Sequence, residues 1–544
     1  MQSKPGVMDI LSISAVALAM SGYLDESRAA STPEVAKSSV ASNECSALKS
    51  LAIPNTTILS AQQIPAGSYT PPGSKVAFDD LPAFCRLTAN VTPVPGSSIG
   101  IEIWLPSNTW NGRYQQVGTH GLGGVFYWSE MAPQLRRGFA TGATDTGHSA
   151  SEGPSAWAIG APERIKDFAY RAVHELADKA KIALKAYYGK PQEFAYFNGC
   201  SKGGGDAMKS AQMYPYDFNG IIAGGAAAHV THGSTAQLIQ TLNLKNAGIQ
   251  GPRGIEILKL AQRSAIAACD ALDGVTDGII SNPSRCNWSA SSLICKPGQD
   301  PATCITSEQS AALTANVAEV VDPASGGAFF PGQSRGAEHD QTKFGWTKGL
   351  SFAGLAVYQM GLGDANWDGS TFDFRRDSPI VDKVLQSVNA IDPDLSAFKK
   401  AGGKLIQWHS WDDSQFQPLF QIHYYEQVAA LMDGIQNVED FYRLFMVPAQ
   451  GHCSGSGVGP SNIGGEGQIA VSNDAQHDVV TALQTWVEQG KAPNQLIATR
   501  FANKDGRQEI DMQRPICRYP LEAVYKGSGN PNAASSFYCG TLQP

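Results

Sequence analysis

A serine flanked by glycines, between a strand-like and a helix-like run, constrains this chain more than any other feature. Residues 199–203 read Gly-Cys-Ser-Lys-Gly, which places Ser201 at the centre of a G-x-S-x-G motif. The strand-like run covers residues 193–198, and the helix-like run covers residues 206–213. A sharp turn between a strand and a helix exposes the serine hydroxyl, and the N-terminus of the helix favours developing negative charge. The pattern predicts that Ser201 is a nucleophile.

Strand-like and helix-like segments alternate on both sides of this motif. Helical patterns cover residues 165–188 and 424–432. The predicted strands that share this rhythm are residues 100–105, 114–118, 139–145, 193–198, 219–225, 404–409 and 442–447. Strands that alternate with helices form a doubly wound, mostly parallel sheet. Together with the serine turn, the rhythm predicts an α/β-hydrolase fold.

The rhythm breaks down in the middle of the chain. Residues 228–393 contain short helical patterns, many Gly, Pro and Asn residues and four of the ten cysteines. We expect this segment to be a large inserted lid domain. The catalytic domain is then split into a first part, residues 44–227, and a second part, residues 394–544.

The N-terminus and the charge balance predict where the protein works. Lys4 precedes an apolar run at residues 10–19, and small residues near Ala29 resemble a cleavage site, so residues 1–30 are predicted to be a signal peptide. We expect a secreted or periplasmic protein whose mature form has no membrane partner, because the apolar run is too short to span a bilayer. With a net charge of −8 and no basic run, nucleic acid is excluded as a partner. Nothing in the sequence predicts the oligomeric state.

A serine nucleophile needs a base and an acid that orients the base. In this fold the chain order is serine, acid, histidine, with both partners on loops after later strands. His452 lies in a glycine-rich turn directly after the strand at 442–447, and we predict that it is the base. Asp412 and Asp413 both follow the strand at 404–409, and their chemistry alone does not separate them. His409, in that same strand, is open to interpretation as a packed core histidine.

The ten cysteines include no C-x-x-C pair, and their even number predicts five disulfides formed in an oxidising compartment. Cys200 precedes Ser201 and Cys453 follows His452, so contact between the serine and the histidine would bring these two sulfurs close enough to bridge. Proximity in sequence favours the pairs Cys269–Cys286, Cys295–Cys304 and Cys517–Cys539. The remaining pair is then Cys45–Cys85.

Short stretches spread over nearly the whole mature chain match one known family. They are residues 110–113 (Trp-Asn-Gly-Arg), 199–201 (Gly-Cys-Ser), 269–274 (Cys-Asp-Ala-Leu-Asp-Gly), 394–398 (Asp-Leu-Ser-Ala-Phe), 409–413 (His-Ser-Trp-Asp-Asp) and 451–453 (Gly-His-Cys). On these motifs the chain resembles the tannase and feruloyl esterase family, which also contains bacterial mono-hydroxyethyl terephthalate hydrolases. The resemblance implies that Asp413, and not Asp412, is the acid of the triad.

The resemblance also implies an oxyanion hole. Its two donors would be the backbone amides of Lys202 and Gly121, which agrees with the physical need for two amides aimed at the developing oxyanion. Phe416, three residues after Asp413, is our candidate for a substrate contact. Aromatic candidates for a pocket wall in the lid are Trp346, Tyr358, Trp367, Phe372 and Phe374, of which we expect more to pack in the core than to line the pocket.

An acidic loop in the insertion is a candidate metal site. Asp270, Asp273 and Asp277 fall within eight residues and would repel one another without a cation. A solvated acidic turn is the alternative interpretation, and the loop is no EF-hand because it lacks the glutamate at position twelve. The resemblance implies a structural Ca²⁺ ion bound by these carboxylates and by the carbonyls of Val275 and Ile279. We expect no organic cofactor.

These observations predict a secreted serine carboxylesterase. The resemblance implies a small aromatic ester substrate of the hydroxycinnamoyl or galloyl type, hydrolysed through an acyl-enzyme. Three alternatives stay open: a terephthalate monoester (mono-hydroxyethyl terephthalate) hydrolase, a serine peptidase, and a catalytically silent protein that binds phenolics.

Overall fold

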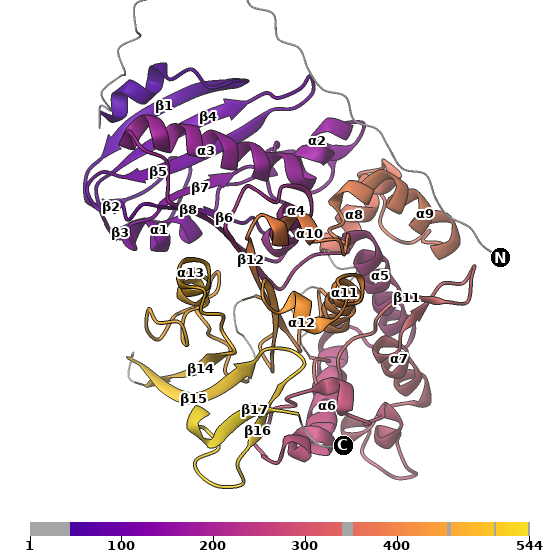
Figure 1. The fold of residues 1–544 in the computed structure, drawn as a ribbon. Coiled ribbons are helices and arrows are strands. Elements are labelled where there is room, and N and C mark those ends of the chain that lie inside the picture. Colours follow the sequence, from indigo (N-terminus) through magenta and orange to yellow (C-terminus); the bar gives the residue numbers. More distant parts are fainter. Residues whose placement is uncertain (1–43, 340–351, 454–457, 505–506, 542–544) are drawn as a thin grey trace, which may run out of the picture. The chain divides into compact units, whose positions relative to one another are not determined.

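The computed structural model describes residues 44–339, 352–453, 458–504 and 507–541 (Figure 1). The expected signal peptide, residues 1–30, and the pocket candidate Trp346 lie outside the described residues. No helix in the described part of the chain is long and apolar enough to cross a membrane.

Within the described residues, one sheet of nine strands has the order β1-β4-β5-β7-β6-β8-β9-β12-β13. Neighbouring strands from β7 to β13 in this order run parallel, while β1, β4, β5 and β7 pair antiparallel. The strands are β1 (Thr56–Ile64), β4 (Phe84–Val91), β5 (Ile99–Pro106), β6 (Arg113–Val117), β7 (Ala140–Thr144), β8 (Phe194–Cys200), β9 (Gly220–Gly224), β12 (Lys404–Ser410) and β13 (Tyr442–Val447). The α/β-hydrolase fold is confirmed, with all seven strands expected from the sequence in this sheet.

Helices cover both faces of the sheet because the central strands are apolar on both sides. Successive strand residues point to opposite faces. Ile221 of β9 packs in the cluster that contains α3, α4 and α11, while its neighbour Ile222 packs against α13. The helices that flank the sheet are α1 (Trp128–Arg136), α3 (Ala172–Tyr188), α4 (Lys202–Met213), α10 (Ser396–Lys400), α11 (Pro418–Leu431), α12 (Ile435–Val438) and α13 (Val479–Gln489). The short helix α2 (Pro162–Lys166) precedes α3 and places Ile165 in a separate apolar cluster.

Residues 228–393 contribute no strand to the central sheet within their described part. Their elements are α5 (Val230–Asn246), α6 (Gly251–Cys269), α7 (Ser307–Val317), α8 (Phe352–Leu362), α9 (Phe374–Leu385), β10 (Val320–Val321) and β11 (Ala328–Phe330). Three apolar clusters of the described residues hold them: one joins α6 and α7, a second joins α8 and α9 to residues just before α3, and a small one joins α5 to β10 and β11. The division of the chain into a split catalytic domain and a lid stays a prediction.

Short antiparallel strands lie outside the central sheet. The hairpin of β2 (Gly67–Tyr69) and β3 (Phe78–Leu81) belongs to the N-terminal half. At the C-terminal end, β14 (Gln495–Lys504) pairs with β15 (Arg507–Cys517), and β16 (Glu522–Tyr525) pairs with β17 (Phe537–Gly540) (Figure 1). The sequence pattern did not predict these C-terminal hairpins.

All ten cysteines lie in the described part of the chain, and they form five disulfides with none left free. The pairs are those expected from the sequence: Cys45–Cys85, Cys200–Cys453, Cys269–Cys286, Cys295–Cys304 and Cys517–Cys539. The bond between Cys200 and Cys453 joins the end of β8 to the loop after β13, across 253 residues of sequence. On a chain-entropy argument, closing so long a loop contributes about 5 kcal/mol to stability.

Candidate active site

Ser201 stands on a strained turn between β8 and α4. Its backbone has φ 64° and ψ −123°, a region that residues with a side chain rarely adopt and that marks functional sites. A Cβ atom added to Gly199 would lie 2.6 Å from the carbonyl carbon of Gly203, and one added to Gly203 would lie 2.8 Å from the Cα of Gly118. Both flanking glycines of the motif are therefore required by close backbone contacts.

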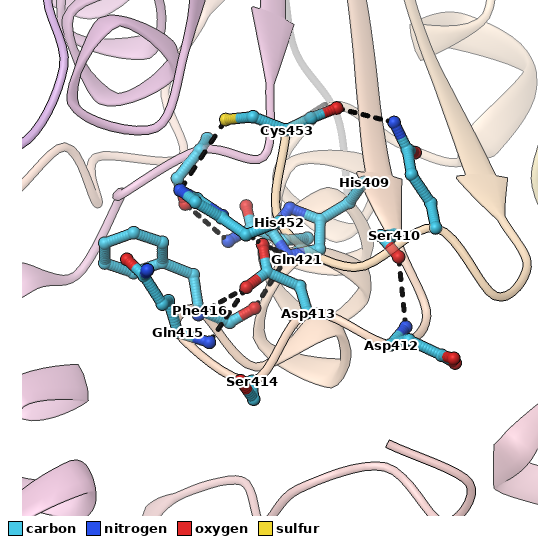
Figure 2. A network of polar contacts seen from close by, with 12 residues as sticks. His409, Ser410, Asp412, Asp413, Ser414, Gln415, Phe416, Gln421, His452 and Cys453 are labelled. Atoms are coloured by element: carbon cyan, nitrogen blue, oxygen red, sulfur yellow. Dashed lines mark hydrogen bonds and ion pairs between the residues drawn. The ribbon is translucent and has the colours of Figure 1, made fainter. Parts of the chain in front are cut away.

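An acid and a base meet on the loops that follow β12 and β13. The Nδ1 atom of His452 lies 2.7 Å from Oδ2 of Asp413 (Figure 2). The other carboxylate oxygen accepts hydrogen bonds from the amides of Gln415, at 2.9 Å, and Phe416, at 3.1 Å. Burial acts to raise the pKa of Asp413, but the charge and hydrogen bond of His452, together with His409 and the Phe416 amide, lower it. The carboxylate is therefore ionised and oriented toward the imidazole.

The structure places the two adjacent carboxylates differently; their chemistry alone left them equivalent, and the family resemblance favoured Asp413. Asp412 points away from His452, and its backbone amide donates to the hydroxyl of Ser410 at 3.1 Å (Figure 2). His409 is fully buried, and its Nε2 atom donates to the carbonyl of Phe416 at 2.7 Å. Burial lowers the pKa of His409, so this residue is a neutral, packed histidine that supports the Asp413 loop.

The disulfide between Cys200 and Cys453 brings the base loop to the serine turn. The Cα atoms of these cysteines are 5.9 Å apart, and their chain neighbours are Ser201 and His452. A Cβ atom added to Gly225 would lie 3.0 Å from the Cys200 sulfur and 3.6 Å from Cε1 of the His452 ring. The histidine ring and the disulfide thus share one narrow space at the end of β8 and β9.

The two amides expected to form an oxyanion hole border the same pocket as the serine. Lys202 is the first residue of α4, and Gly121 lies in the loop after β6 with φ 55°. Ser201, Lys202 and Gly121 all line this pocket. The role of their amides as donors to an oxyanion is part of the proposal below.

This pocket is mostly apolar, and its lining residues come from both parts of the predicted catalytic domain and from the insertion. Phe416 lines it, and the Phe416 ring centroid lies 5.4 Å from that of His452. The remaining described residues of the lining are Gly121, Leu122, Trp157, Ile165, Phe168, Ser201, Lys202, Ala227, Val230, Ser234, Gln237, Val357, Met360, Leu385, Val388 and Gln415. An apolar cleft with few polar groups is typical of a site for a small organic ligand.

The aromatic wall candidates of the insertion that the structure describes do not line the pocket, in keeping with the expectation that more of them are core residues. Tyr358 stacks against Trp367 and meets Phe372 edge to face, and Phe374 packs against Phe329. These contacts place the candidates in the core of the insertion and not in the pocket lining. The aromatic rings that do line the pocket, besides Phe416, are Trp157 and Phe168, which precede α3.

The charged groups near the pocket are already paired. Lys202 is the only cation among the described lining residues, and its ammonium forms an ion pair with Asp206. The same ammonium lies 4.3 Å from the centre of the Phe168 ring. The pocket therefore presents no unpaired positive charge to a ligand.

The acidic loop of the insertion holds its carboxylates among backbone amides. Asp270 accepts hydrogen bonds from the amides of Asp277, Gly278 and Ile279. Asp277 also forms an ion pair with Arg514 of β15. The pKa of Asp277 is raised, mainly by burial. Arg514 acts to lower this pKa, and the carboxylates of Asp273 and Asp270 act to raise it.

These donors have the chemistry that Ca²⁺ prefers, since they are hard oxygen ligands. Arg514 supplies part of the positive charge that the three carboxylates need, so the loop fits a cation only in part. The site formed by Asp270, Asp273 and Asp277 with the carbonyls of Val275 and Ile279 stays a proposal. The ion would have a structural role.

Removing calcium tests this proposal. If the loop holds Ca²⁺ at about a hundred times its dissociation constant, chelation with EGTA lowers the free energy of unfolding by about 3 kcal/mol. The readout is thermal unfolding with and without EGTA, with Asp270→Asn as the variant that no longer responds. Equal melting temperatures with EGTA and with added Ca²⁺ would mean that Arg514 alone neutralises the loop.

Comparison with known proteins identifies the chain's relatives. The family model described as "Tannase and feruloyl esterase" matches residues 85–540. The chain belongs to the tannase and feruloyl esterase family. As a member of this family, it is a carboxylic ester hydrolase.

Relatives in bacteria and fungi cover nearly the full chain. An uncharacterized esterase of Xanthomonas campestris pv. campestris is 35% identical over 533 residues, which span 92% of this chain and 91% of that protein. A probable feruloyl esterase B-2 of Aspergillus terreus is 32% identical and covers 87% of this chain and 91% of its own. The crystal structure of feruloyl esterase B from Aspergillus oryzae superposes with a TM-score of 0.84 at 28% identity, over 91% of this chain and 99% of that one.

Proposed function

We propose that this member of the tannase and feruloyl esterase family is a secreted serine esterase that hydrolyses esters of hydroxylated aromatic acids through an acyl-enzyme. The observation that supports it most directly is the hydrogen bond between His452 and Asp413, on a loop that the Cys200–Cys453 bond fastens beside Ser201. An apolar pocket adjoins this arrangement. The five disulfides favour an oxidising compartment, which is the basis for proposing export.

The proposed reaction has two halves. In the first, His452 takes the proton of Ser201 while Oγ attacks the ester carbonyl, and Asp413 stabilises the imidazolium. The amides of Lys202 and Gly121 stabilise the oxyanion, and collapse of the tetrahedral species expels the alcohol, which receives the proton from His452. In the second half, His452 takes a proton from water, which attacks the acyl-enzyme carbonyl. Collapse of the second tetrahedral species breaks the bond to Oγ of Ser201, and His452 returns the proton to Oγ, which releases the acid and free Ser201.

Gln237 supports an acyl group that carries a hydroxyl. This residue of α5 lines the pocket and is 3% exposed. Its Nε2 atom donates to the carbonyl of Gln415, which fixes the orientation of the amide. Among the described residues, its Oε1 atom has no hydrogen-bond partner. A buried acceptor without a partner favours a ligand that brings a donor, such as a phenolic hydroxyl.

The same features weigh against a terephthalate monoester as the natural substrate. A free carboxylate in this pocket would find no unpaired cation, because the one cation among the described lining residues is committed to Asp206. Neither arginine near the start of α9 is free to bind a substrate carboxylate, because Arg375 donates to the carbonyl of Pro323 and Arg376 pairs with Asp377.

A panel of esters tests the proposal. We expect turnover of methyl ferulate and methyl gallate, with a lower kcat/KM for the terephthalate monoester and for a nitrophenyl alkanoate. A preference for the terephthalate monoester would establish the rival esterase, and turnover of the alkanoate alone would refute aromatic selection. Turnover of amides as fast as esters would indicate a peptidase, and no turnover of any compound would favour a protein that only binds phenolics.

Replacing Gln237 tests the acyl contact. We expect Gln237→Leu to lower the preference for methyl 4-hydroxycinnamate over methyl cinnamate by about tenfold, because a hydrogen bond to a buried hydroxyl is worth about 1.4 kcal/mol. The measurement is the ratio of the two kcat/KM values. If the substitution also disturbs the Gln415 loop, it lowers kcat/KM for both substrates alike, and this common effect cancels in the ratio. An unchanged ratio would mean that Gln237 does not contact the hydroxyl.

A further inference from the structure

A second cluster of ligand-type side chains lies beside the serine turn, outside the pocket described above. His120 comes from the loop after β6, Glu130 from α1, and Glu466 from the loop between β13 and α13. One ligand atom from each residue lies within 4.8 Å of the other two. None of these residues has a role in the proposed ester hydrolysis.

Glu466 is the buried member of the cluster and has an oxygen without a hydrogen bond. The residue is 3% exposed, and one carboxylate oxygen accepts the backbone amide of Cys200. Among the described residues, the other oxygen, Oε1, has no hydrogen-bond partner and faces Nε2 of His120 at 3.6 Å. This separation is within the range of an ion pair but too long for a hydrogen bond. It suits two ligands of one ion, since zinc lies about 2.1 Å from each of its nitrogen and oxygen ligands.

The charge balance of the cluster also favours a cation. Glu130 and Glu466 bring carboxylate oxygens within 4.8 Å of each other, and Glu466 is buried. Two carboxylates that approach each other in a partly buried site need a positive charge if both are to stay ionised. A divalent ion would supply it.

We propose that His120, Glu130 and Glu466 bind a divalent transition-metal ion of the zinc class. One imidazole nitrogen and two carboxylates match the nitrogen and oxygen ligands of zinc. The imidazole disfavours Ca²⁺ and Mg²⁺, which take oxygen ligands. The site shares no residue with the acidic loop around Asp270.

The proposed ion would be accessible from solvent. Glu130 and Glu466 line a cavity of about 500 Å³ together with Gly467, whose amide donates to Glu130 at 3.2 Å. A water molecule from this cavity can complete a tetrahedral site around three protein ligands. We therefore expect the ion to exchange with added metal and with chelators.

Its position would join two parts of the esterase site. His120 immediately precedes Gly121 of the expected oxyanion loop, and Glu466 holds the amide of Cys200, next to Ser201. The ion would thus tie the loop after β6 to the end of β8. Binding itself does not depend on which ester the protein hydrolyses, so it can be tested separately from the proposed function.

The test is calorimetric titration of the chelator-treated full chain with Zn²⁺ in a buffer that contains Ca²⁺. We expect the wild-type protein to bind Zn²⁺ saturably. We expect His120→Ala and Glu130→Gln each to weaken this binding by at least about tenfold, because even the loss of a residue that only hydrogen-bonds to a metal ligand has an effect of that size. Thermal unfolding checks that each variant is folded. Because Glu130 is partly exposed, Glu130→Gln gives a result even if His120→Ala does not fold.

Two histidine variants serve as controls. His477, which pairs with Asp474 on the surface, represents incidental zinc binding, and His452 represents binding at the esterase site. We expect His477→Ala and His452→Ala to keep the wild-type affinity. The proposal is overturned if wild-type protein does not bind Zn²⁺, if binding survives Glu130→Gln unchanged, or if His452→Ala abolishes it.

Discussion

Replacing Ser201 by alanine should lower kcat for the best ester substrate by about a million-fold, the largest effect that we expect from any single substitution. Without Oγ no acyl-enzyme forms, and only slow attack by water assisted by the oxyanion hole remains. The measurement is steady-state hydrolysis of the best ester of the panel. Melting temperature should change little, because the substitution removes one oxygen atom and leaves the backbone of the turn in place.

Ser234 offers a matched control, because it is also a buried serine that lines the pocket. We expect Ser234→Ala to keep kcat within about tenfold of wild type, an effect no larger than that of one neutral hydrogen bond. If Ser201→Ala retained more than a small fraction of the activity, the nucleophile would have to be sought elsewhere.

Replacing Asp413 by asparagine should lower kcat by about ten-thousand-fold, which is the second largest expected effect. An amide in this position keeps the shape of the site but no longer stabilises the imidazolium that His452 becomes. Asp412→Asn is the paired control, and we expect it to keep kcat within about tenfold, because Asp412 points away from His452 (Figure 2). Equal losses in the two variants would contradict the assignment of the acid.

The central sheet could be predicted because its strands are short apolar runs that alternate with amphipathic helices. Strands β1 and β4 could not, since they pair antiparallel at the edge of the sheet and lie outside that alternation. The C-terminal hairpins escaped prediction for a similar reason: β15 mixes charged and apolar residues, and it pairs antiparallel with β14 outside the alternation of strands and helices.

In the site, residues that stand in local sequence motifs could be predicted, whereas residues that join the site only through the three-dimensional fold could not. Ser201 and His452 stand in turns whose sequence is itself a signal. The choice between Asp413 and Asp412 depends on which carboxylate the loop turns toward His452, and neighbouring residues of the same type carry no such information. Trp157, Phe168 and Gln237 line the pocket from segments where an apolar or amide side chain looks the same in sequence whether it faces a core or a ligand.

The bond between Cys200 and Cys453 has a consequence for how the protein matures. Its first sulfur belongs to the serine turn, and its second belongs to a loop that the ribosome adds 253 residues later. A chain that stops before residue 453, or that pairs Cys200 with another thiol, cannot fasten the histidine loop beside the serine. Covalent completion of the site thus requires a polypeptide that extends past residue 453 and is correctly oxidised, so this disulfide makes activity depend on maturation as well as bracing the fold.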